Sequence, residues 1–90
     1  MKIHRRKHLE AWEFEGLQHT DTWCELLRNR LVLTHSVPAS QLSDFRAELI
    51  EHVEQVVRSD FHVRTQGDAC VLYFVSATDA AAAEHSIENT

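Results

Sequence analysis

One stretch near the end of the chain, CVLYFV at residues 70–75, is apolar at every position. Successive side chains of a β-strand point to opposite faces of the sheet, so a strand of this composition has two apolar faces. Such a strand belongs in the interior of a sheet whose faces are both covered, or nearly so. The stretch therefore predicts a layered domain built around one buried strand.

A second strand precedes this one, and the pattern predicts a hairpin. Residues 61–66 alternate apolar and polar side chains, and Gly67-Asp68 separates them from the apolar run of residues 69–75. A pair that contains glycine can supply the positive φ of a tight turn. The alternation gives this strand a dry face and a polar face, and the polar face carries His62, Arg64 and Gln66.

Three segments have the pattern of helices. The clearest spans residues 41–58, where apolar residues recur every three or four positions on one face: Leu42, Phe45, Leu49, Val53 and Val56. A shorter helix is expected at residues 20–29, and another at residues 78–87, where Ser76 or Thr78 caps a run of alanines. Two further strands are expected, at residues 9–16 and at residues 31–35.

The expected order is β-α-β-α-β-β-α, a small single α+β domain with an antiparallel sheet and helices on one face. From residue 31 on, the order β-α-β-β-α resembles five of the six elements of a ferredoxin-like split β-α-β sheet. The N-terminal strand could supply the missing element, in a circularly permuted version of that plan. The other face of such a sheet is often open, and His62, Arg64 and Gln66 are expected to point toward it.

Length and charge limit the class of protein further. Ninety residues suffice for one domain, expected at residues 9–90 behind a basic tail at residues 1–8. The net charge is −5, but the tail holds four basic residues and no acid, so the rest sets five basic residues against all 14 acids and carries −9. An acidic body repels a phosphate backbone. Nucleic-acid contact is therefore expected only weakly, through Arg5, Arg6 and Lys7.

The chain shows no sign of a membrane protein. The longest apolar run, residues 69–75, is about a third of the ~20 residues that a membrane span needs. The basic start has no apolar stretch behind it, so it does not read as a secretory signal. We expect a cytoplasmic protein.

No pattern indicates catalysis or a cofactor. The sequence has no P-loop, dinucleotide fingerprint or nucleophile elbow. His19 and Cys24 would form a catalytic pair only if the thiol were activated, and no neighbouring sequence feature indicates an activated thiolate. Cys24 and Cys70 lack metal-ligand spacing, so both are expected to be small buried apolar residues. On the helix at residues 41–58, Glu48 and His52 have the i,i+4 spacing of a chelating pair, but zinc usually takes three or four ligands. We expect a solvated pair there, no cofactor and no enzyme.

Three features are candidate interaction sites. The polar side of the helix at residues 41–58 is acidic and includes Glu48, Glu51 and Glu54. Such a side is usually only solvated, and the sharper hypothesis is that it engages a basic groove on another protein. The second feature is the polar face of the hairpin. The third is Trp23, which would be a good interface anchor if partly exposed, whereas Trp12 is expected in the core.

These features favour a small non-enzymatic protein-interaction domain that regulates or inhibits a larger partner, with homodimerisation compatible with that role. Two alternatives stay open. One is an acidic inhibitor of a nucleic-acid-handling machine encoded by a mobile element. The other is a metal- or small-ligand-binding sensor that uses histidines, with His19, His35, His52 and His62 as the candidates.

Overall fold

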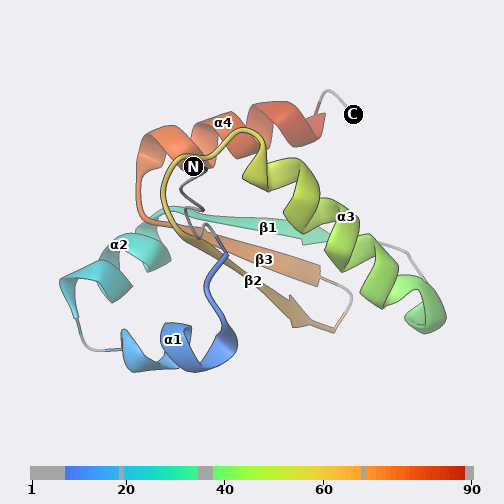
Figure 1. The fold of residues 1–90 in the computed structure, drawn as a ribbon, viewed down its shortest axis with the longest axis horizontal. Coiled ribbons are helices and arrows are strands. Elements are labelled where there is room, and N and C mark those ends of the chain that lie inside the picture. Colours follow the sequence, from blue (N-terminus) through green and yellow to red (C-terminus); the bar gives the residue numbers. More distant parts are fainter. Residues whose placement is uncertain (1–7, 19, 35–37, 68, 89–90) are drawn as a thin grey trace, which may run out of the picture.

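The computed structural model describes residues 8–18, 20–34, 38–67 and 69–88. These residues form the elements drawn in Figure 1, in the following order: α1 (Ala11–Gly16), α2 (Asp21–Arg28), β1 (Arg30–Thr34), the short 3-10 helix η1 (Ala39–Gln41), α3 (Leu42–Glu54), β2 (Phe61–Gln66), β3 (Ala69–Phe74) and α4 (Ala77–Glu88). The predicted basic contact through Arg5, Arg6 and Lys7 lies outside the described residues, as do His19 and His35.

Strand β3 is the centre of a three-stranded sheet with the order β1-β3-β2 (Figure 1). It runs antiparallel to both neighbours, with Leu72 of β3 opposite Leu31 of β1 and Val63 of β2. Strands β1 and β2 are therefore parallel to each other, and the segment that contains α3 joins them. The predicted α+β class, the antiparallel sheet and the hairpin are confirmed.

The tight turn of the hairpin depends on Gly67. Its φ is 60°, in the left-handed region that glycine adopts at no steric cost. Asp68, the other residue of the predicted turn, lies outside the described residues.

Helices α3 and α4 cover one face of the sheet. The buried residues of this main core come from α3, the loop after it, β2, β3 and α4: Leu49, Val53, Val57, Phe61, Val63, Cys70, Leu72, Phe74 and Ala83. The apolar stripe predicted for α3 supplies part of this set, although the helix ends at Glu54 rather than at residue 58. The fully buried Ala83 of α4 has a side chain small enough for the helix to pack closely.

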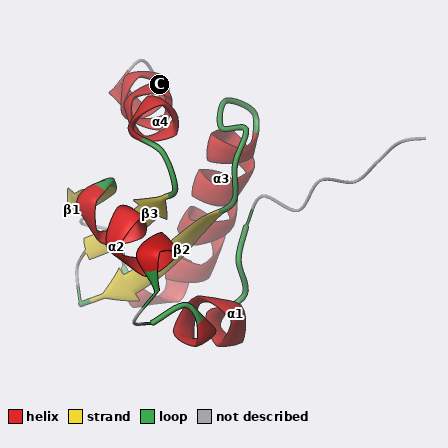
Figure 2. Cartoon of the chain, turned by 90° about the vertical axis from the view of Figure 1, so that its left-hand side faces the viewer, coloured by secondary structure: helices red, strands yellow, loops and turns green. Residues whose placement is uncertain are grey.

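Helices α1 and α2 cover part of the other face, so the predicted placement of helices on one face only is wrong. Phe14 of α1 and Leu26 of α2 pack against Val71 and Tyr73 of β3 in a second core. Figure 2 shows α1 below the sheet and α4 above it. The domain therefore has three layers, as the two apolar faces of β3 require.

The strand predicted at residues 9–16 is also wrong, because these residues form α1 and the order becomes α-α-β-α-β-β-α. The alternation of Trp12, Glu13, Phe14 and Glu15 is too short to distinguish a strand from a helix, and alanine and glutamate favour the helix. Phe14 is buried, but Trp12 is 71% exposed, so its expected place in the core is wrong too. Residues 9–16 therefore do not supply the N-terminal strand of the permuted plan.

His8 and Leu9, which lie a little before α1, form strand-like backbone contacts with β2. His8 forms an isolated parallel bridge with Phe61, and the Leu9 N–H donates to the Phe61 carbonyl at 2.6 Å. This contact lies at the outer edge of β2.

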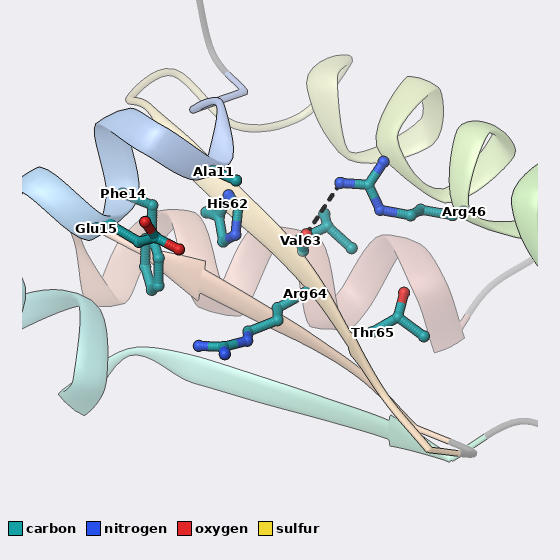
Figure 3. Close-up of a pocket in the computed structure, with 8 residues that line it drawn as sticks. All are labelled: Ala11, Phe14, Glu15, Arg46, His62, Val63, Arg64 and Thr65. Atoms are coloured by element: carbon teal, nitrogen blue, oxygen red, sulfur yellow. Dashed lines mark hydrogen bonds between the residues drawn. The ribbon is translucent and has the colours of Figure 1, made fainter.

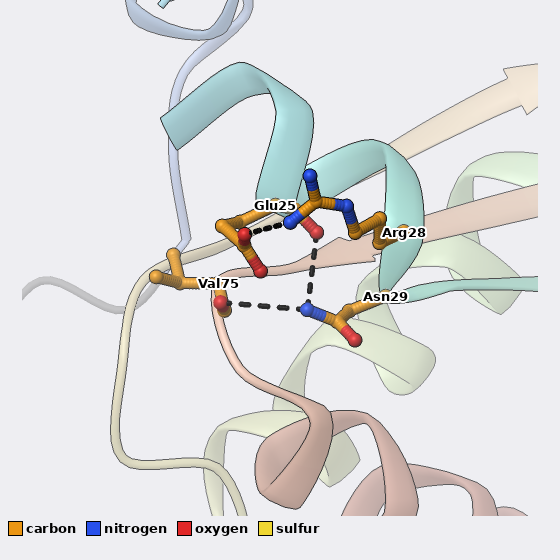
Figure 4. A network of polar contacts seen from close by, with 4 residues as sticks. All are labelled: Glu25, Arg28, Asn29 and Val75. Carbon is orange, nitrogen blue, oxygen red and sulfur yellow. Dashed lines mark hydrogen bonds and ion pairs between the residues drawn. The ribbon is translucent and has the colours of Figure 1, made fainter. Parts of the chain in front are cut away.

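Asn29 joins α2 to the sheet (Figure 4). Its side-chain amide donates to the carbonyls of Glu25 at 3.1 Å and Val75 at 3.5 Å, and its own carbonyl accepts from the Phe74 N–H at 3.1 Å. An exposed ion pair between Arg28 and Glu25 lies beside it. These bonds hold the C-terminal end of α2 against the end of β3.

Candidate functional site

The acidic side of α3 is exposed at each predicted position. Glu48, Glu51 and Glu54 are all exposed, and Asp44 extends the series by one turn toward the start of the helix. Asp44, Glu48 and Glu51 follow one another at spacings of four and three, so they form one stripe along the helix. Glu54 continues from Glu51 at the end of the helix.

An apolar groove of about 370 Å³ borders this stripe. Its apolar lining comes from three elements: Leu33 of β1, Phe45 and Leu49 of α3, and Ile87 of α4. Glu48 and His52 are its polar lining residues. The groove adjoins a second hollow of about 380 Å³, which shares Phe45 and Glu48 with it and adds Gln41 and Asp44. The acids follow from the sequence but the groove does not, because the groove needs residues from three elements far apart in the chain.

His52 links α3 to α4 at one end of the groove. Its Nε2 lies 2.7 Å from Ser86 Oγ and 3.1 Å from the Ser86 carbonyl oxygen. Within the described ranges, no group of three or more His, Cys, Asp or Glu residues converges on a possible metal position. The structure therefore adds no third ligand to the Glu48–His52 pair from those ranges.

The polar face of β2 is not a uniform open surface. Arg64 and Gln66 are exposed as expected, but His62 is only 5% exposed, so its predicted exposure on an open face is wrong. The ring of Phe14 stacks on His62 with centroids 4.2 Å apart. The Nδ1–H of His62 donates to the Leu9 carbonyl at 2.9 Å. Because residues 9–16 cross this face as a loop and a helix, the open part begins only beyond His62.

Burial lowers the pKa of His62 below its ordinary value of 6.5, and the positive charges of Arg46 and Arg64 lower it further. The hydrogen bond to Leu9 and the charge of Glu10 act in the opposite direction without cancelling the effect of burial. The unfolded chain therefore takes up a proton near pH 6.5 that folded His62 resists. The lowered pKa costs no stability above about pH 6.5. Below that pH it lowers the free energy of unfolding, and by more as the pH falls further.

We accordingly expect the free energy of unfolding to decrease as the pH is lowered from about 7.5 to about 5.5. The variant His62→Gln should show a smaller decrease over the same range. Urea denaturation at the two pH values measures it. Arg64→Gln keeps the imidazole and removes one cation that lowers its pKa, so its pH dependence should lie between those of the other two proteins. Equal slopes for all three proteins would contradict the assignment to His62.

A smaller hollow of about 210 Å³ lies beside His62 at the edge of β2 (Figure 3). Arg46 reaches it from α3 and donates through Nη2 to the Val63 carbonyl at 3.1 Å. Arg64 and Glu15 line it as well, so it contains charges of both signs. Arg46 was not singled out in the sequence, because only the fold brings it to the sheet edge.

Trp23 is partly exposed, as the interface-anchor hypothesis requires. Its ring also meets Phe14 edge-on, with centroids 4.9 Å apart, and packs against the second core. Trp23 therefore has a structural role in holding α2 to α1.

The two cysteines differ in environment. Both are free thiols; Cys70 is buried as expected, but Cys24 is exposed, which corrects its predicted burial. Burial raises the pKa of the Cys70 thiol above its ordinary value, so this group is a poor nucleophile. His19, the other member of the sequence pair with Cys24, lies outside the described residues.

No protein-family model, no curated protein and no solved structure matches this chain. No helix in the described ranges is long and apolar enough to cross a membrane.

Proposed function

We propose that this domain is a non-enzymatic binding module that regulates or inhibits a larger protein by holding one of its segments in the groove along α3. The occupant is a basic segment with an apolar side chain between its cations. The observation that carries this proposal is the position of the acids Asp44 and Glu48 directly beside an apolar lining.

The two parts of the surface have different energetic roles. Burying one large apolar side chain between Phe45, Leu49 and Ile87 contributes roughly 1.5–3 kcal/mol. Each exposed ion pair with an acid of α3 contributes about 0.2–1 kcal/mol and is screened by salt. The apolar anchor therefore supplies affinity, while the acids select a basic partner and speed its approach.

The sign of the charge also bears on the class of partner. Exposed carboxylates repel nucleic acid itself but attract the basic segments of proteins that bind it. The hypothesis of an inhibitor of a nucleic-acid-handling machine uses these same acids, so it is a particular case of this proposal.

We further infer that the described residues follow a ferredoxin-like plan as far as α4. Support comes from the strand order β1-β3-β2, from the parallel relation of β1 and β2 across α3, and from the placement of α3 and α4 on one face. In the split β-α-β plan, a further strand would follow α4.

The test uses two designed 18-residue helical peptides, one of leucine and lysine and one of leucine and glutamate. We expect the lysine peptide to shift the NMR signals of Leu33, Phe45 and Ile87, and Glu48→Lys with Glu51→Lys to weaken its binding about tenfold or more at low salt. A control with the same charge change, Glu15→Lys with Asp21→Lys, lies on α1 and α2 and should leave the affinity within about twofold.

Two results would overturn the proposal. One is equal binding of both peptides. The other is equal weakening by both pairs of substitutions, because the attraction would then follow net charge rather than the groove. Circular dichroism of each variant checks that the fold is retained.

A further inference from the structure

The outer edge of strand β1 has no pairing strand among the residues that the structure describes. The Phe74 N–H donates to the Asn29 carbonyl, so residues 29, 31 and 33 direct their backbone groups toward β3. Because these groups alternate in direction along a strand, the N–H and C=O of Arg30, Val32 and Thr34 point away from the sheet. Within the described ranges, no backbone hydrogen bond outside the sheet involves β1 residues, and Figure 2 shows β1 at the outer side of the sheet.

At the opposite edge of the sheet, two outward carbonyls of β2 have hydrogen-bond partners. Along β2, the Phe61 carbonyl accepts from the Leu9 N–H, and the Val63 carbonyl accepts from Arg46. Open strand edges are templates for pairing with another chain, and proteins commonly cover or charge them. On β1 the middle residue of the edge is instead the apolar Val32, which is 60% exposed.

We propose that β1 pairs antiparallel with β1 of a second copy around a twofold axis at Val32, so that two three-stranded sheets join into one of six strands. Val32 then faces Val32 of the second copy, and each Arg30 faces Thr34 of the other chain. All of these residues have outward backbone groups, so the three facing pairs form two hydrogen bonds each, about six in all.

The side chains of β1 suit a second copy in this register. Leu31 and Leu33, which are half-buried against the main core, lie opposite each other across the axis and extend that core from one subunit into the next. The two exposed valines meet on the other face. An axis at Arg30 would instead set two guanidinium groups opposite each other, which is unfavourable. The interface is isologous, so pairing stops at the dimer.

This inference is independent of the proposed function, because it uses the backbone edge of β1 rather than the acids of α3. Val32→Pro removes an outward N–H from the interface and leaves the ladder between β1 and β3 intact. The matched control is Thr65→Pro, because the N–H of Thr65 points outward from the opposite edge, in phase with Phe61 and Val63.

Sedimentation and light scattering from about 10 µM to about 1 mM measure the mass of each protein, with the dissociation constant following from the concentration dependence. We expect wild type and Thr65→Pro to reach twice the chain mass of 10.4 kDa. We expect Val32→Pro to stay near 10.4 kDa, its dissociation constant raised about 30-fold or more by the loss of two hydrogen bonds.

A monomeric wild type at all concentrations would overturn the proposal, as would a dimer that survives Val32→Pro or dissociates equally with Thr65→Pro. If Val32→Pro fails to fold, amide hydrogen exchange of the wild type decides. The proposal then requires the amides of Arg30, Val32 and Thr34 to gain protection as concentration rises, while those of Val63 and Thr65 do not. Concentration-independent exchange at β1 would exclude the dimer and leave its edge to a strand of another protein.

Discussion

Replacing Phe14 by alanine is expected to lower the free energy of unfolding by about 3–5 kcal/mol. The side chain is only 2% exposed, and its ring contacts His62, Trp23 and Tyr73 with centroids 4.2–4.9 Å away. It therefore joins α1 and α2 to the sheet, and alanine would leave a cavity where these elements meet. Small domains are stable by only about 5–15 kcal/mol, so much of the total would be lost.

Equilibrium urea denaturation followed by circular dichroism measures this loss. The matched control is Trp12→Ala, because Trp12 lies on the same helix but is 71% exposed, and its replacement should change stability by no more than about 0.5 kcal/mol. Near-ultraviolet signals from Trp23 should change in Phe14→Ala, since its packing partner is removed. Similar losses in both variants would show that the second core does not depend on Phe14.

Replacing Asp79 by alanine is expected to cost a similar amount, about 3–5 kcal/mol. Asp79 is only 6% exposed. Its Oδ1 accepts from the Arg58 N–H at 3.2 Å and its Oδ2 from the Ser59 N–H at 2.9 Å, so one carboxylate holds the loop between α3 and β2. Alanine would leave both donors without their partner in a part-buried position, which is the costly outcome for a polar group.

Asp79→Asn removes only one of the two hydrogen bonds. The amide keeps one acceptor oxygen for one backbone N–H, but it presents an NH₂ group, which cannot accept, to the other. We expect a loss of about 2 kcal/mol for this variant, between those of wild type and alanine. Glu84→Ala, an exposed change on the same helix, is the control and should stay within about 0.5 kcal/mol. A loss for Asp79→Ala no larger than the control would contradict the structural role of the carboxylate.

The contacts of Asp79 follow only in part from the local sequence. The sequence predicted that Ser76 or Thr78 caps the helix expected at residues 78–87, and Ser76 Oγ does accept from the Asp79 N–H at 3.1 Å. That much is local, since the two residues are three apart. The bonds from Arg58 and Ser59 cross about 20 positions of chain, and no local pattern indicates them.

The candidate site divides in the same way. The exposed acids of α3 followed from helical periodicity, because residues on the outer side of an amphipathic helix are solvated wherever the helix packs. The groove beside them did not follow, because it needs Leu33 and Ile87 next to α3. His62 was misplaced for a similar reason, since the residue that covers it, Phe14, was assigned to a strand.

The local sequence is enough to predict that β3 is buried on both faces, that Gly67 lies in the turn of the hairpin and that α3 has one apolar side. Each of these features follows from the spacing of residues close together in the chain. Because a strand repeats every two residues and a helix about every 3.6, this spacing shows which side chains share a face. What covers the second face of the sheet depends on contacts between residues far apart in the chain. Residues 11–16 become a helix, and His62 becomes a buried imidazole bonded to Leu9, 53 positions away. A short segment with mixed local preference takes its conformation from contacts with the rest of the fold. Here Phe14 packs against His62 and Tyr73, and both partners are in place only once the sheet has formed.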